Sequence, residues 1–241
     1  MKIQKTTLII LLCVASLFIS CGVEMMNGVT GNRNVTRENR KISATFTDIK
    51  VSNGIELHLN TGTKNKVTVE ADENLLGLIK TKIEDGVLKV YSEKNMYRAK
   101  SKKVYVTIIQ LNNVEASSGS SVLSKDTFNT KSAKIKASSG ADISIALNSE
   151  TIETKTSSGA DIKISGKAIN HNATASSGSS INAYNLKSTH VVANANSGGD
   201  IDIYASESLE ANANSGGNID FKGSPKHITK NSNSGGSISA K

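Results

Sequence analysis

Aromatic side chains, proline and cysteine are all scarce in this chain. Of its 241 residues, 4% are aromatic, none is tryptophan, one is proline and two are cysteine. Two cysteines cannot form the disulfide framework that small secreted domains use in place of a core. Hydrophobic residues make up only 37% of the chain, but they recur at fixed intervals, which argues against disorder. The glycine, serine and asparagine content excludes a coiled coil.

The first twenty residues have the pattern of an export signal. Lys2 and Lys5 precede an apolar run at residues 8–19, which is shorter than the ~20 residues that a membrane span needs. The segment Leu17–Gly22 (LFISCG) resembles a bacterial lipobox. That resemblance implies cleavage after Ser20 and a lipid anchor on the thiol of Cys21. An ordinary secretory signal with an incidental cysteine is the alternative.

These features predict a lipoprotein signal peptide at residues 1–20, a flexible tether at 21–40 and one folded domain at 41–241. The tether is mostly polar, so few of its residues can be buried. The predicted location is the cell envelope, with the lipid anchor in the outer membrane and the body facing the surface or the periplasm. The membrane is then the first partner, and nucleic acid is a poor partner for an exported protein.

A repeat of about nineteen residues organises the second half of the chain, residues 114–241. A Ser-Gly pair recurs seven times, and an aliphatic residue or a similar small one follows three and five positions after each glycine. The pairs are Ser118-Gly119, Ser139-Gly140, Ser158-Gly159, Ser177-Gly178, Ser197-Gly198, Ser215-Gly216 and Ser234-Gly235. Alternation of apolar and polar positions predicts short strands with one buried face. Because no single unit can bury that face, we predict stacked coils of an all-β solenoid, a single-stranded β-helix.

Residues 41–113 are predicted to belong to the same body as wider, less regular first coils. Strands are expected at 46–51, 55–59, 66–70, 79–83, 87–92 and 104–111, with turn signals such as Asn53-Gly54 between them. Asp72 is expected to cap a helical turn at 72–78, and a loop is expected at 93–103.

Three segments resemble the head GIN domain, an auto-transporter adhesin family of exported Bacteroidetes proteins. They are Phe46–Leu57 (FTDIKVSNGIEL), Val104–Thr107 (VYVT) and Ala116–Ser120 (ASSGS). The resemblance spans about residues 44–240. It implies a right-handed β-helix on a cell-envelope lipoprotein with an adhesin-like or structural binding role, and it brings no catalytic residues.

Tyr184 and Tyr204 both fall six residues after a corner glycine, and Lys222 takes the same place in the next coil. We expect the two rings to stack on the outer face beside the Lys222 cation. Such a surface suits a sugar or a peptide, so these residues are candidate ligand contacts for a glycan or a host or matrix protein. An ordinary solvent-side stack that stiffens the rod is the alternative.

Asp142 and Asp161 are further candidate contacts, since both lie two residues after a corner glycine on successive coils. A Ca²⁺ bridge between such carboxylates is conceivable, but the nineteen-residue period does not match known calcium-binding β-rolls. We therefore predict no metal site and no cofactor.

Catalysis is not predicted, although β-helices include polysaccharide-processing enzymes. Residues 41–241 hold a single arginine, Arg98, and the four histidines are scattered along the sequence at His58, His171, His190 and His227. Such enzymes need a clustered acid and base. A glycan-binding or polysaccharide-processing protein remains the alternative to an adhesin-like module.

Two further surfaces are suggested by the sequence. The net charge is +8, and the densest basic run comprises Lys94, Arg98, Lys100, Lys102 and Lys103. This run is either a solvated loop or a contact for an anionic glycan or lipid headgroup. The last coil, near Ile238 and Ala240, has no evident cap, so self-association through its open edge is expected to be possible.

Overall fold

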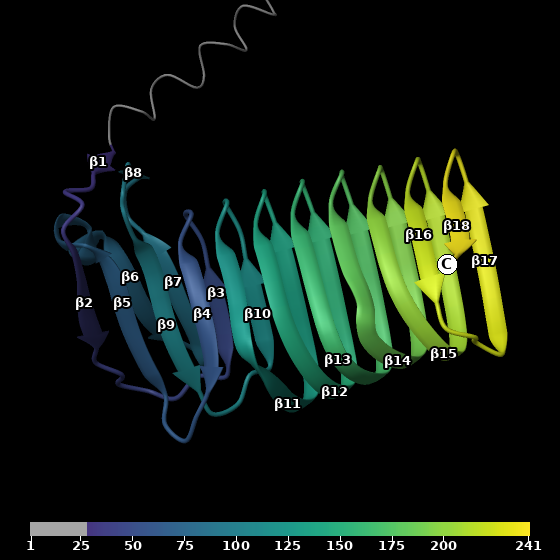
Figure 1. Ribbon diagram of the computed structural model, residues 1–241, viewed down its shortest axis with the longest axis horizontal. Coiled ribbons are helices and arrows are strands. Elements are labelled where there is room, and N and C mark those ends of the chain that lie inside the picture. Colours follow the sequence, from purple (N-terminus) through teal and green to yellow (C-terminus); the bar gives the residue numbers. More distant parts are fainter. Residues whose placement is uncertain (1–27) are drawn as a thin grey trace, which may run out of the picture.

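The computed structural model describes residues 28–241, so the predicted signal peptide and Cys21 lie outside the described residues. The described chain is all-β, with eighteen strands and one short 3-10 helix. Sixteen strands join in one sheet that winds into a solenoid (Figure 1). The all-β solenoid predicted from the sequence is therefore confirmed.

Five long, bent strands form the regular coils, each running from one corner around the lower edge of Figure 1 to the next corner. They are β11 (Ser121–Ser138), β12 (Asp142–Ser157), β13 (Asp161–Ser176), β14 (Ser180–Asn196) and β15 (Asp200–Asn214). The last coil consists of β16 (Asn218–Lys222) and β17 (His227–Asn233), and β18 (Ser237–Ala240) begins another. Neighbouring coils pair in parallel, which stacks equivalent residues in columns.

The Ser-Gly corners are tight because both residues are left-handed. The seven serines have φ between 49° and 56°, and their glycines have φ between 66° and 78°. Glycine adopts such angles without strain, whereas serine does so at some cost. The glycine N–H of each coil donates to the serine carbonyl of the next coil at 3.0–3.2 Å. Gly54 joins this ladder through Ser118, so Asn53-Gly54 is the first corner of the series.

The interior is a narrow double layer of the predicted aliphatic and small side chains. Ile143, Ile162 and Ile181 are buried in register on the face that follows the corners. Alanine and threonine fill the opposite face, as with Thr154 and Ala173, which are also buried and paired. Small residues on one side let the two faces approach closely, which makes the rod thin.

The first part of the chain starts the solenoid and closes its end. Strands β3 (Asp48–Val51), β4 (Glu56–Thr61), β9 (Lys102–Ile108) and β10 (Asn113–Ala116) pair in parallel with the coils or each other. Strand β7 (Val87–Ser92) also pairs in parallel with β3. By contrast, β6 (Ile79–Glu84) pairs antiparallel with β7, and β5 (Lys66–Asp72) pairs antiparallel with β9. The predicted first coils at residues 41–113 are therefore only partly solenoid coils. Antiparallel strands cover the sheet edge that a solenoid coil would leave unpaired.

The structure differs from the predicted tether at residues 28–40. There β1 (Val29–Thr30) pairs with β8 (Met96–Tyr97), and β2 (Val35–Arg40) pairs antiparallel with β5. Arg37 forms an ion pair with Glu70 at 2.6 Å, and Arg40 donates to the carbonyl of Leu76 at 2.7 Å. An edge strand of this kind is held by backbone and polar contacts, so its polar sequence does not prevent folding.

The expected helical turn is present as a 3-10 helix, η2 (Glu73–Leu78), but Asp72 does not cap it through its side chain. The Asp72 carboxylate instead accepts hydrogen bonds from backbone N–H groups of other segments. Within residues 28–241, no helix is long and apolar enough to cross a membrane.

Candidate functional site

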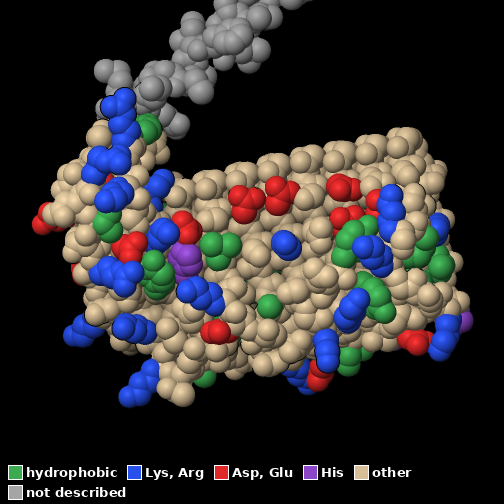
Figure 2. Space-filling model, viewed as in Figure 1, with side chains coloured by type: hydrophobic (Ala, Val, Ile, Leu, Met, Phe, Trp, Pro, Cys, Tyr) green, Lys and Arg blue, Asp and Glu red, His purple; other side chains and the backbone are tan. Residues whose placement is uncertain are grey.

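The solvent-facing side of the strands that follow the corners, here called the front face, holds the predicted contact residues. Asp142 and Asp161 are exposed and in register on adjacent coils, as expected. Asp161 accepts a hydrogen bond from the Ser180 hydroxyl of the next coil at 2.5 Å. Figure 2 shows acidic side chains in a row below the ridge of corners. Among residues 28–241, no group of three or more histidine, cysteine, aspartate and glutamate side chains could hold a metal ion.

Tyr184 and Tyr204 lie on the front face of neighbouring coils, but within the described residues their rings do not stack on each other. Each ring instead lies under a lysine. The Lys187 Nζ is 3.8 Å from the centroid of the Tyr204 ring, and the Lys222 Nζ is 4.2 Å from the centroid of the Tyr184 ring. We call these four residues the tyrosine-lysine patch. Cation–π contacts at partly exposed sites of this kind contribute about 0.5–1 kcal/mol each.

A bulge explains why the rings do not stack. The register of β14 on β15 runs from Ala183–Ile203 directly to Ser188–Ala205, which leaves residues 184–187 opposite Tyr204 alone. The additional residues move Tyr184 out of column and bring Lys187 over the Tyr204 ring. Lys187 was not among the predicted contact residues, although the corner spacing of 20 residues before Gly198 and 18 after it indicates the bulge.

Carboxylates underlie the patch and affect its titration. The Tyr184 hydroxyl hydrogen-bonds to Asp202, and burial, followed by this bond and the nearby negative charges, raises the pKa of Tyr184. Burial also raises the pKa of Asp202, and repulsion from Asp200 and Asp220 adds to this. Asn182 donates to Asp202 at 3.3 Å. Tyr184 is therefore a neutral hydroxyl held in place by its carboxylate partner.

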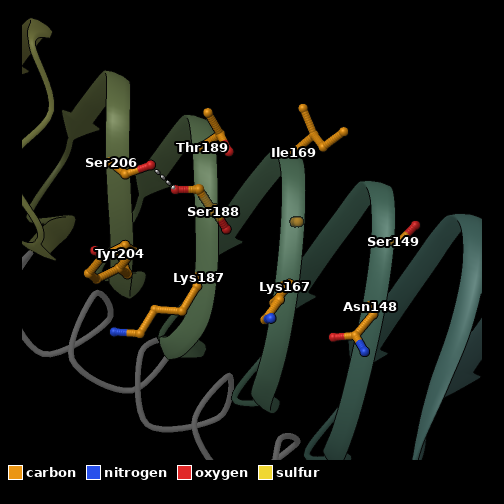
Figure 3. Close-up of a pocket in the computed structure, with 10 residues that line it drawn as sticks. Asn148, Ser149, Lys167, Ile169, Lys187, Ser188, Thr189, Tyr204 and Ser206 are labelled. Carbon is orange, nitrogen blue, oxygen red and sulfur yellow. Dashed lines mark hydrogen bonds between the residues drawn. The ribbon is translucent and has the colours of Figure 1, made fainter.

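A shallow cavity of about 460 Å³ adjoins the patch where the long strands bend (Figure 3). Its lining has two lysines, one tyrosine ring, several hydroxyls and no carboxylate. The lining residues are Asn148, Ser149, Lys167, Ala168, Ile169, Lys187, Ser188, Thr189, Tyr204 and Ser206. In Figure 3, Asn148, Lys167 and Lys187 project side by side from successive coils, with Tyr204 beyond the Lys187 ammonium group. This arrangement can bind an anionic group without covalent chemistry.

Two of the histidines that are distant in sequence, His190 and His227, lie two coils apart in one column. Register places Ser208 between His190 and His227 on three successive coils. The His190 Nδ1 is 2.9 Å from the Ser208 Oγ. Among the described residues, no carboxylate hydrogen-bonds to the His190 ring. His190 and Ser208 therefore lack the third group that orients the base in a catalytic triad.

Comparison with known families identifies the fold's relatives. The profile of the family described as "Putative auto-transporter adhesin, head GIN domain" matches residues 45–225. The chain belongs to this family. The resemblance found in the sequence is thereby confirmed, and the family description indicates a cell-surface or envelope protein.

Three solved structures with this fold come from Bacteroides and Parabacteroides species. One is a putative adhesin from Bacteroides fragilis, with a TM-score of 0.83 and 21% identity, covering 89% of this chain and 100% of that chain. A putative adhesin from Parabacteroides distasonis has a TM-score of 0.72 and 19% identity, covering 89% and 100%. A putative lipid binding protein from the same species has a TM-score of 0.70 and 19% identity, covering 89% and 99%. At these identities the likeness establishes the fold alone, and the curated proteins give no match.

A second polar cluster lies at the start of the front face in this head GIN domain. His58 stacks on Tyr105 at 4.9 Å between ring centroids and contacts Glu56 at 2.5 Å. The Arg37 guanidinium lies 5.3 Å from the centroid of the same Tyr105 ring. These side chains contact one another, so the cluster is best explained as packing between the end strand β2 and the first coils.

Proposed function

We propose that this head GIN domain protein is a lipid-anchored, adhesin-type binding protein of the cell envelope, held in the outer membrane, that engages its partner through the tyrosine-lysine patch. The observation that supports this most directly is the pair of half-buried tyrosine rings, each covered by a lysine, beside an open cavity. Binding here needs no chemical step.

Two properties of the patch favour contact with a ligand. Lys187 and Lys222 are exposed, and within residues 28–241 neither forms an ion pair with a carboxylate. Their ammonium groups are therefore available to an incoming anion. The row containing Asp142 and Asp161 borders the same face and adds acidic character near the corners. A partner with both charged and apolar groups matches this surface, as host or matrix proteins do.

A glycan is the second candidate ligand, and the cavity lining favours an acidic one. Lys167 and Lys187 face a space bordered by hydroxyls and by the Tyr204 ring, with no carboxylate to repel a uronic acid or a sulfate. Ammonium groups act as point charges toward such anions, and a tyrosine ring packs against the apolar side of a sugar. Polysaccharide processing is the less favoured alternative, since Asp220 is ion-paired with Lys241 at 3.2 Å and Asp202 is hydrogen-bonded.

The test is an array of glycans and matrix proteins probed with a lipid-free form of the chain, residues 22–241. Tyr184→Ala with Tyr204→Ala should weaken binding about tenfold or more, because both ring contacts are lost. Tyr91→Ala, a half-buried tyrosine on β7, is the matched control and should bind normally. Undiminished binding by the double variant would refute the patch as the contact surface. Shortened products from a bound glycan, seen by mass spectrometry, would favour processing instead.

The lipid anchor is tested separately. Radioactive palmitate should label the protein in cells, and Cys21→Ala should abolish the label because the thiol is the predicted attachment atom. Labelling that persists in Cys21→Ala would contradict the anchor and leave the proposed binding surface unaffected.

A further inference from the structure

The end of the solenoid nearest the start of the described chain is strongly basic. Residues 28–40 and 93–103 hold eight lysines and arginines but only two glutamates. Figure 2 shows these cations gathered at the end where the described chain begins. Four of them are exposed and form no ion pair within residues 28–241. We call this set the basic end surface: Arg33, Lys94, Arg98 and Lys100.

The acidic groups nearby are already occupied. Glu93 pairs with Lys80 at 3.3 Å, and Glu73 accepts a hydrogen bond from the amide of Asn34 at 3.0 Å. Asp72 is fully buried, and its two oxygens accept the backbone N–H groups of Arg33, Lys100 and Ser101. The cations of these two segments outnumber the acidic groups beside them, and this positive excess attracts an external anionic surface.

The basic end surface is fixed to the chain that leads toward Cys21. Val29 donates to the Asn95 carbonyl at 2.8 Å, and Gly31 donates to the Tyr97 carbonyl at 2.9 Å. A Cβ atom at Gly31 would lie 2.1 Å from an Asp72 oxygen, so this contact is tight. The first described residues after the predicted anchor are thus held against the basic loop by backbone hydrogen bonds.

The predicted anchor at Cys21 limits the distance between the basic end surface and the membrane. Six residues lie between Cys21 and Gly28, and the seven Cα–Cα steps of an extended chain span at most about 25 Å. A lipid on Cys21 therefore confines the basic end surface to the neighbourhood of the membrane.

We propose that the basic end surface rests on anionic lipid headgroups of the membrane that holds the anchor. The inference uses the proposed anchor for its geometry, whereas the cations and their fixation are features of the described residues. The solenoid then stands away from the membrane. Six coil spacings of about 4.8 Å separate β9 from β15, which holds Tyr204 about 29 Å further out.

Vesicle co-sedimentation with the lipid-free form, residues 22–241, tests this directly. The chain contains every described residue and lacks the lipid, so binding reports on the protein surface alone. We expect binding to phosphatidylcholine vesicles that contain phosphatidylglycerol, no binding to phosphatidylcholine alone, and release by high salt. The variant Lys94→Gln, Arg98→Gln, Lys100→Gln should lose about a hundredfold in partition coefficient, since each basic residue near such a surface contributes about a factor of five.

The matched control removes the same charge elsewhere. Lys131, Lys136 and Lys155 are exposed on the regular coils, and their replacement by glutamine should leave vesicle binding nearly unchanged. Equal losses in both triple variants, or equal binding to neutral vesicles, would overturn the inference. So would binding to soluble heparin without binding to anionic vesicles, which would identify an anionic polysaccharide as the partner. Loss of the anchor would be seen only in the palmitate experiment, so the two failures are distinguishable.

Discussion

The His171 Nε2 lies 2.9 Å from the Thr154 hydroxyl in the interior between β12 and β13. Both side chains are fully buried, and within the described residues the Nδ1 of His171 has no hydrogen-bond partner. The column above and below holds Ile152 and Val191, so a polar pair interrupts an aliphatic stack. Burial lowers the pKa of His171 to about 4, which makes this ring neutral in the folded protein at neutral pH.

Stability should therefore fall in mild acid. The unfolded chain binds a proton at His171 with a pKa of about 6.5, whereas the folded chain resists protonation down to about 4. The stabilisation is complete above pH 6.5 and is lost as the pH falls through this range, by about 2 to 3 kcal/mol at pH 4.5. Urea unfolding at pH 7.5 and 4.5 measures the change. Carboxylates such as Asp72 also weaken the fold in acid, so the comparison with a variant lacking His171 isolates its share.

Replacing His171 and Thr154 by apolar side chains should give a folded variant that lacks the buried imidazole. Thr154→Val alone leaves the second imidazole nitrogen without a partner and should cost about 1–3 kcal/mol. Adding His171→Leu restores an apolar column next to Ile152 and Val191, so the double variant should be at least as stable as the natural chain at pH 7.5. It should also lose less stability at pH 4.5. A double variant less stable than Thr154→Val would show that the imidazole is required for packing.

The regular coils could be predicted because two independent patterns in the sequence indicate them. The Ser-Gly spacing fixes the corners, and the alternation around Ile143 and Ile162 fixes which side is buried. His171 shows the limit of this pattern, since its column is aliphatic in the neighbouring coils and the burial of an imidazole depends on Thr154 in the adjacent coil. Strand β2 was not predicted, because an edge strand buries little and needs no apolar alternation.

For the candidate site, the repeat pattern predicted three of the four residues of the tyrosine-lysine patch. Tyr184, Tyr204 and Lys222 do lie together on the front face, as the shared position after the corner predicts. The contact of Lys187 with Tyr204 depends on a bulge, which breaks the column rule from which the residues were chosen. Side-chain contacts across a register shift cannot be predicted from the repeat period, because the period assigns residues after the bulge to the wrong neighbours.

Gly166 should be a sensitive position in the lower bend. Its φ is 121°, and a Cβ atom there would lie 1.9 Å from the carbonyl oxygen of Leu147 on the preceding coil. Gly166→Ala must push two coils apart and should destabilise the protein by at least about 2 kcal/mol. Gly77→Ala is the control, since its Cβ would meet open space and its φ is not left-handed. That change should be neutral or stabilising by less than about 1 kcal/mol, as measured by urea unfolding midpoints.

Lys230 should protect the open end of the solenoid from self-association. It pairs in register with Ala211, so a lysine takes the place of an alanine on the exposed edge strand β17. Its Nζ lies 4.6 Å from the centroid of the Phe221 ring. An inward-pointing charge on an edge strand prevents a second chain from pairing with it, because pairing would bury the charge.

Lys230→Ala should therefore increase the fraction of dimers, formed by β17 strands of two copies. Sedimentation velocity over a range of protein concentrations measures this. Lys226→Ala is the matched control, because it removes the same charge from a residue before β17 that is ion-paired with Glu207 at 2.9 Å. If Lys230→Ala sediments like the natural chain, the edge is protected by some other feature, such as its polar side chains. If Lys226→Ala dimerises equally, net charge and not the position of Lys230 controls association.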